Sequence, residues 1–250
     1  MKQKYLLMIV IFIFAGCGYA NIPNVDLTPE IKLDNPGEQR KQDRAKYNHG
    51  SKYQMQMSRM MFSYMFSAGG IWPWQKDFTP GEWTKWRITS GEEQKYITEL
   101  ASLKQAEDNK KWWRIKTATD KESTLIYEAL IHSDDYSIRR LRSKINDQQP
   151  QELPVRENSH VYNRPMELTE ESIKAASVGN EKINVPAGTF KTKHIRYGTP
   201  ANQGKINIWM NKDVPGGVVK YNLTQSEGDN AFTAELLDYG KGATTVLNSY

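Results

Sequence analysis

The stretch KKWWRIKTATDKESTLIYEALIHS, residues 110–133, contains two runs in which apolar and polar side chains alternate, separated by a short charged segment. Alternation with a period of two places apolar residues on one face of an extended strand and polar residues on the other. In the second run the apolar face holds Leu125, Tyr127, Ala129 and Ile131, and the polar face holds Glu128 and His132. The stretch therefore predicts two strands of an antiparallel sheet with one buried face.

Similar runs surround this stretch. EWTKWRITS (82–90), KYITELASL (95–103) and YSIRRLRSKI (136–145) continue the pattern, so we predict a meander over residues 81–145. Residues 146–180 are expected to form a loop with a short helix near 169–176, where two glutamates mark a helix start. Turn signals at Pro186–Gly188 and Val214–Gly217 then predict C-terminal hairpins over residues 181–248.

The N-terminal residues have the layout of a secretion signal. Lys2 and Lys4 precede an apolar run, Tyr5 to Phe14, which is shorter than the roughly 20 residues of a membrane span but suits a signal peptide. Phe14-Ala-Gly-Cys17 resembles the lipobox of bacterial lipoproteins, although Phe14 stands where leucine is usual. In that family the cysteine receives a diacylglyceryl group and an N-acyl chain and becomes the mature N-terminus.

The lipobox resemblance implies that residues 1–16 are a cleaved signal peptide, that Cys17 is lipidated, and that the chain needs no other cofactor. Several acyl chains anchor a protein firmly to a membrane, whereas one chain holds it only marginally. By the same resemblance, Gly18 after the cysteine favours the outer membrane; which face of that membrane the body occupies stays open. A plain signal peptide with a chance cysteine, or a buried N-terminal helix, is the alternative.

Residues 17–50 are rich in turn formers and charged or amide side chains, and we interpret them as a flexible tether. A methionine-rich helix is predicted over residues 52–68, and Gly69-Gly70 ends it. Its candidate apolar binding face contains Met57, Met60, Met61 and Tyr64. Three interpretations stay open: a core helix packed on the sheet, a plastic surface for acyl chains or an apolar partner, and a copper(I) site on thioethers.

Composition and motifs argue against several function classes. The net charge of +5, which falls to +3 once Lys2 and Lys4 are removed, is spread along the chain, so nucleic acid is not expected as a partner. This mild charge is compatible with adhesion to anionic headgroups but does not require it. The four histidines have no metal-ligand spacing, and no nucleophile, metalloprotease or nucleotide-binding motif occurs. We therefore expect no catalytic residues, no metal and no enzyme activity.

Because Trp112 and Trp113 are adjacent, one is expected in the core and the other half-exposed.

Four segments carry a second resemblance, which covers roughly residues 78–250. FTPGEWTKWRI (78–88), VPAGTFKTKHI (185–195), INIWMNKDVPGGVVKY (206–221) and LLDYGKGA (236–243) resemble a group of uncharacterised bacterial envelope proteins. The last three are also similar to periplasmic β-domains grouped with the LolA and LolB lipoprotein-carrier fold. That resemblance implies a curved antiparallel sheet, an incomplete barrel covered by helices, whose hollow holds acyl chains.

Together these observations predict an α+β protein that is mostly antiparallel β. Residues 51–250 are expected to form a single domain, a curved sheet or half-barrel covered by the methionine-rich helix, after the signal and tether. The predicted function is that of a non-enzymatic outer-membrane lipoprotein whose half-barrel binds acyl chains, an apolar partner or another envelope protein. The alternative is a structural or surface-interaction lipoprotein with a filled core.

Overall fold

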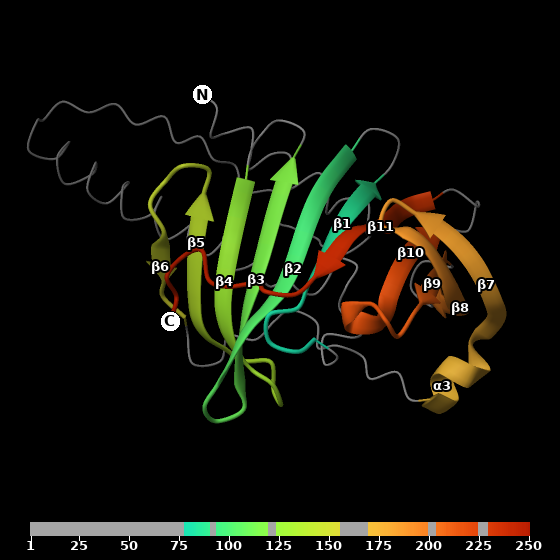
Figure 1. Cartoon of the computed structure of the whole chain (residues 1–250), viewed down its shortest axis with the longest axis horizontal. Helices are drawn as coiled ribbons and strands as arrows, with labels where there is room; N and C mark the ends of the chain where they lie inside the picture. Colours follow the sequence, from blue (N-terminus) through green and yellow to red (C-terminus); the bar gives the residue numbers. More distant parts are fainter. Residues whose placement is uncertain (1–77, 91–93, 120–123, 156–169, 200–203, 225–229) are drawn as a thin grey trace, which may run out of the picture. The chain divides into compact units, whose positions relative to one another are not determined.

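Eleven antiparallel strands form one open sheet in the part of the chain that the computed structural model describes, residues 78–90, 94–119, 124–155, 170–199, 204–224 and 230–250 (Figure 1). All of these residues belong to the compact unit Phe62–Tyr250. The predicted mostly antiparallel β class is therefore confirmed. The predicted methionine-rich helix, signal peptide and tether lie outside the described residues.

The sheet consists of two meanders. The strands are β1 (Trp83–Ser90), β2 (Gln94–Ala106), β3 (Lys110–Thr119), β4 (Thr124–His132), β5 (Ile138–Ile145), β6 (Gln151–Leu153), β7 (Ser177–Val185), β8 (Gly188–Thr199), β9 (Gly204–Met210), β10 (Val218–Thr224) and β11 (Asn230–Gly240). Their order is β6-β5-β4-β3-β2-β1-β11-β10-β9-β8-β7. From the centre of the sheet, β1 to β6 follow one another toward one edge, and β11 to β7 follow one another toward the other edge. The first strand, β1, and the last strand, β11, are therefore neighbours at the centre.

The elements match most of the sequence prediction. The meander over residues 81–145 is present as β1 to β5, and the short helix is α3 (Glu170–Ala175). At the predicted turns, Gly188 has φ +132° and Gly217 has φ +72°, both in the region that favours glycine. Gly217 belongs to η2 (Pro215–Gly217), a short 3₁₀ turn between β9 and β10.

Three boundaries were predicted wrongly. The segment expected to be a loop and helix, 146–180, contains the short edge strand β6 and the start of β7 at Ser177. Three residues are too few to show a recognisable alternation. They form a strand because they pair with β5. The hairpins expected up to residue 248 end with β11 at Gly240, and residues 241–250 form no strand.

The sheet curves toward its apolar side, and Phe78 shows this most directly. Its ring lies 5.6 Å from the ring of Trp113 in β3, in an edge-on arrangement. The same ring lies against Gly216 in the β9–β10 connection, where a Cβ would collide with it. Because β3 and β10 are separated by three strands in the sheet order, one side chain reaches both only if the sheet bends around it.

A backbone contact joins the tip of the β7–β8 hairpin to β11. The Ala187 N–H donates a 3.1 Å hydrogen bond to the Leu236 carbonyl. The ladder between β10 and β11 ends at Glu235, so β10 supplies no ladder partner for Leu236. The hairpin tip satisfies that carbonyl and fixes the curl of this half of the sheet.

Candidate interaction faces of the sheet

Alternation gives the sheet an apolar face and a polar face. Across β1 to β5 the apolar face is formed by Trp86, Leu100, Trp113, Tyr127 and Leu141, and the polar face by Arg87, Glu99, Arg114, Glu128 and Arg142. The predicted split of β4 is confirmed, since Tyr127, Ala129 and Ile131 are buried on the face opposite to Glu128.

Most large side chains of the apolar face are buried over β1 to β5, whereas Leu125 and Ile145, at one end of β4 and β5, are half-buried. Trp86, Leu100 and Tyr127 are each 1% exposed, Leu141 is 0% exposed and Trp113 is 5% exposed. An open ligand hollow would leave the side chains that line it accessible. Over these strands the apolar face therefore has the character of a filled core.

One row of the apolar face is less deeply buried over β8 to β10, although Ile195 and Ile208 beside it are buried. Tyr197, Ile206 and Leu223 lie opposite one another in the register of these strands, and all three are half-buried. The Tyr197 hydroxyl is 3.5 Å from the Ser172 carbonyl of α3. This apolar row offers partly accessible surface on the apolar face of the sheet.

On the polar face, the segment Lys241–Tyr250, here named the strap, crosses β2 to β5 (Figure 1). Ala243 joins Trp112, Ala101 and Leu103 in an apolar cluster, and the Tyr250 ring lies 5.8 Å from the Trp112 ring. Trp112 is consequently only 3% exposed. The expectation that one of the two adjacent tryptophans is half-exposed was wrong, because the strap gives the polar face a cover of its own.

The strap is fastened by the buried carboxylate of Glu128, which is 0% exposed. This carboxylate accepts hydrogen bonds from the Thr245 hydroxyl at 2.5 Å, the Val246 N–H at 2.7 Å and the Ser249 hydroxyl at 2.5 Å. Three donors satisfy a charge that would otherwise be expensive to bury.

Arginines on the neighbouring strands hold the strap carbonyls. Arg114 and Arg142 flank Glu128 in the register. Arg114 donates to the Thr244 carbonyl and to Glu99, the latter at 2.9 Å. Arg142 donates to the carbonyls of Leu247 and Asn248. Arg140 adds a 3.1 Å bond to the Ser249 carbonyl and a bidentate pair with Glu152. The strap is therefore held mainly through its backbone and two hydroxyl groups.

A second polar cluster lies on the same face over β7 to β10. The His194 ring is stacked on Trp209 with centroids 4.6 Å apart, and its Nδ1 lies 2.9 Å from Glu181 Oε1. Its Nε2 lies 3.0 Å from Asn207 Oδ1, which also accepts from Arg196 Nε at 2.7 Å. Both ring nitrogens therefore face oxygen acceptors. Asn207 Nδ2 also donates a 2.9 Å hydrogen bond to Asn222 Oδ1 on β10, so these contacts tie the four strands β7 to β10 together. They contain no nucleophile for the histidine to activate.

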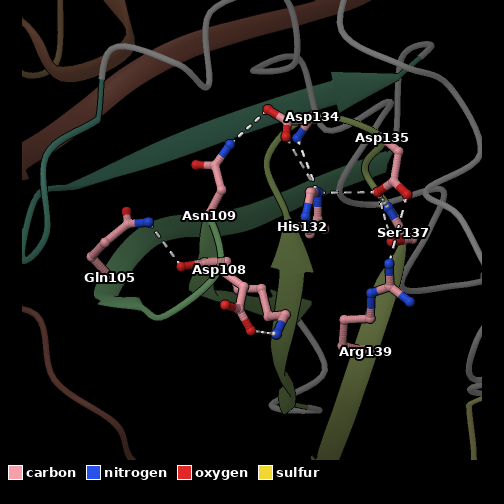
Figure 2. A network of polar contacts seen from close by, with 9 residues as sticks. Gln105, Asp108, Asn109, His132, Asp134, Asp135, Ser137 and Arg139 are labelled. Carbon is pink, nitrogen blue, oxygen red and sulfur yellow. Dashed lines mark hydrogen bonds and ion pairs between the residues drawn. The ribbon is translucent and has the colours of Figure 1, made fainter.

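A third network joins two turns at one end of the first meander (Figure 2). Asn109, in the β2–β3 turn, donates a 2.6 Å hydrogen bond to Asp134, in the β4–β5 turn. Asp135 accepts from the Ser137 hydroxyl at 2.6 Å and from its N–H at 2.8 Å. These two hydrogen bonds, aided by the charges of His132 and Arg139 and opposed by burial, lower the pKa of Asp135 below its ordinary value of 3.8.

Lys111 is the one lysine of the described residues whose pKa is clearly displaced. Burial lowers it, while the charge of Glu82 opposes the change. Its ammonium group donates a 3.0 Å hydrogen bond to the Phe78 carbonyl and lies 5.3 Å from the centre of the Trp113 ring. These contacts fasten Phe78 onto β3, which is a structural role.

The site residues predicted from the sequence, Cys17, Met57, Met60, Met61 and Tyr64, lie outside the described residues. Within the described part of the chain, no group of three or more His, Cys, Asp or Glu side chains is arranged to hold a metal ion. No helix in that part is long and apolar enough to cross a membrane.

The contacts among the charged residues of the polar face were not predicted from the sequence. Alternation identified Glu128 as a polar-face residue, but the pairing of Glu128 with Arg114 and Arg142 depends on strand register, which a single sequence does not reveal. The sequence signal that could have indicated these contacts is the occurrence of arginine and glutamate on the polar face of successive strands.

No known protein family matches the sequence, and no curated protein does. Solved structures match in part. A Bacteroides fragilis protein described as having a YmcC-like fold is 13% identical, with a TM-score of 0.36 over 66% of this chain and 97% of its own. MucB is 10% identical, with a TM-score of 0.42 over 69% of this chain and 57% of its own. A Pseudomonas aeruginosa MucA/MucB complex gives 12% identity and a TM-score of 0.41, over 70% of this chain and 56% of that chain. This chain thus spans just over half of the MucB chains.

Proposed function

We propose that this chain is a non-enzymatic lipoprotein of the bacterial outer membrane that acts as an interaction module through the surface of its sheet. The observation that carries the proposal is the filled apolar face, where Trp86, Leu100 and Tyr127 are each 1% exposed. A partner or membrane then meets the outside of the sheet. The lipobox resemblance at Cys17 supports anchoring by covalent acyl chains.

The contacts of the polar groups support a role without catalysis. The carboxylate of Glu128 is saturated by the strap, and the ring of His194 is engaged at both nitrogens. A general acid, base or nucleophile needs free access to a reacting group. These side chains are instead occupied in holding strands and strap together.

A second candidate function is the binding of acyl chains or an apolar partner. The half-buried row of Tyr197, Ile206 and Leu223 favours it, because it leaves apolar surface on the curved sheet. In that case the predicted helix face with Met57, Met60, Met61 and Tyr64 covers the mouth of the sheet.

The anchoring is tested by Cys17→Ala in the producing bacterium. We expect the variant to lose labelling by radioactive palmitate and to leave the membrane fraction, because the thiol that carries the diacylglyceryl group is gone. Unchanged partitioning into the detergent phase contradicts the lipoprotein assignment.

The choice between the two candidate functions is tested by native mass spectrometry of the Cys17→Ala protein recovered from the soluble fraction. An interaction module with a filled core gives the mass of the polypeptide alone. Bound phospholipid or fatty acid, retained by the folded protein, favours the carrier function instead.

A further inference from the structure

The polar face carries a cluster of basic side chains beside the strap. Lys85 and Arg87 lie on β1, Lys95 on β2, Lys116 on β3 and Lys144 on β5; these five residues are named the basic patch. Register places them together: Lys85 is opposite Glu99, Glu99 is opposite Lys116, and Lys116 and Lys144 both lie opposite Ile126. The patch is thus assembled from four strands of the first meander.

Within the described part of the chain, the basic patch is accessible and few carboxylates lie in register with it. Arg87, Lys95 and Lys116 are exposed, and Lys85 and Lys144 are half-buried. The nearby carboxylates are engaged elsewhere: Glu99 is bonded to Arg114 at 2.9 Å, and Glu235 is bonded to Lys220 at 2.8 Å.

Asp238 is the other acidic residue in register with the patch, opposite Lys85. Within the described residues, no ion pair joins the five patch cations to a carboxylate. Neighbouring strands are about 4.8 Å apart, so each cation of the patch lies within one or two Debye lengths of the next one at physiological ionic strength.

We propose that the basic patch docks the sheet onto the anionic headgroups of a phospholipid bilayer. A sheet face presents its cations side by side, which suits the plane of phosphates at a membrane surface better than a single deep anion pocket does. Ile97 lies between Arg87 and Ala118 in the register and is 40% exposed, which adds an apolar contact at the centre of the basic surface. The inference rests on the lipid anchoring proposed above, which keeps the sheet close to a membrane.

The test uses full-length protein extracted from membranes and reconstituted into vesicles of phosphatidylcholine alone or of phosphatidylcholine and phosphatidylglycerol in equal parts. Lysines are acylated by an amine reagent and quantified by mass spectrometry. We expect labelling of Lys85, Lys95, Lys116 and Lys144 to fall about threefold on the anionic vesicles and to recover in high salt. The exposed lysines Lys174, Lys182 and Lys191, on α3, β7 and β8, serve as comparison residues and should not change.

A matched pair of variants separates the patch from the total charge. Replacing Lys85, Arg87 and Lys116 together with Gln should abolish the protection of Lys95 and Lys144. Replacing Lys174, Lys182 and Lys191 with Gln removes the same charge and should leave that protection intact. Equal protection of all lysines, or equal effects of the two triple variants, overturns the proposal.

Flotation with the neutral vesicles reports separately on the anchor. A protein that floats with them but shows no patch protection on anionic vesicles overturns the docking and leaves the anchoring in place. A protein that does not float with neutral vesicles contradicts the anchoring. In that case, binding to anionic vesicles with protection of the patch lysines still supports the docking role of the basic patch. If the protein does not bind anionic vesicles either, the docking role is overturned.

Discussion

The Ser249 hydroxyl donates a 2.5 Å hydrogen bond to the Glu128 carboxylate, joining residues that are 121 positions apart in the chain. The strap thereby covers the sheet on the face that alternation leaves polar. Ser249 is only 2% exposed, so this contact is shielded from water.

The first prediction concerns this carboxylate. Glu128→Ala should lower the free energy of unfolding by about 3 kcal/mol, because it leaves the three strap donors unpaired and removes the buried carboxylate that lies beside Arg114 and Arg142 in the register. Chemical denaturation of the purified protein measures the change.

Glu128→Gln is the matched control. Its amide keeps an oxygen for the Val246 N–H, and the hydroxyls of Thr245 and Ser249 can turn to accept from its NH₂ group. We expect a smaller loss than for Glu128→Ala. Equal losses in the two variants contradict the role assigned to the strap hydrogen bonds.

The second prediction concerns the β9–β10 connection. Gly216 and Gly217 have nearly the same positive φ, +71° and +72°, but a Cβ at Gly216 meets the Phe78 ring, whereas one at Gly217 meets nothing within 4 Å. Gly217→Ala should cost about 1 kcal/mol through backbone strain. Gly216→Ala should cost clearly more, because Phe78 must also move out of its contact with Trp113.

Thermal unfolding of the two alanine variants checks this, with Gly217→Ala as the strain-only reference. If the two variants are equally stable, Phe78 does not pack between β3 and the β9–β10 connection, and the curvature of the sheet inferred from that packing is wrong.

The third prediction is a pH dependence at the β4–β5 turn. Because the pKa of Asp135 is lowered in the folded state, its charged form adds stability above its ordinary value of 3.8, and this stability is lost as the pH falls through the folded-state value. Ser137→Ala removes the hydroxyl that donates to Asp135, so it should be less stable than the parent near neutral pH. The difference should narrow as the pH falls below 3.8.

Melting curves recorded across the acid range measure this difference, and Asp135→Asn provides the control. Its amide oxygen still accepts from Ser137 but does not titrate, so its stability should approach that of the parent at low pH. A Ser137→Ala deficit that stays constant with pH assigns the effect to packing alone.

The fourth prediction concerns the methionine-rich segment. With a filled core, replacing Met60 and Met61 together with Gln should destabilise the domain by about 1–3 kcal/mol per residue, because unpaired amides are costly to bury. Circular dichroism during denaturation measures this loss. A variant that keeps its strand signal and stability but loses a co-purified lipid points to the carrier function instead.

Turn chemistry and alternation made most of the strands predictable. Both are local properties: a period of two assigns Tyr127 and Glu128 to opposite faces wherever the strand lies, and Gly188 marks its hairpin whatever packs around it. Edge strand β6 was missed because three residues between prolines carry no period, and they become a strand only by pairing with β5.

The sequence by itself determined a two-faced antiparallel sheet and the position of its hairpins, because backbone sterics and side-chain alternation act between near neighbours. Only the tertiary structure decided that β1 pairs with β11, that the strap buries Trp112, and that Lys85, Arg87 and Lys116 share one surface. These relationships depend on strand register and on contacts between residues far apart in the chain. The residues that stabilise each contact lie in different segments, so no short stretch of sequence contains both partners.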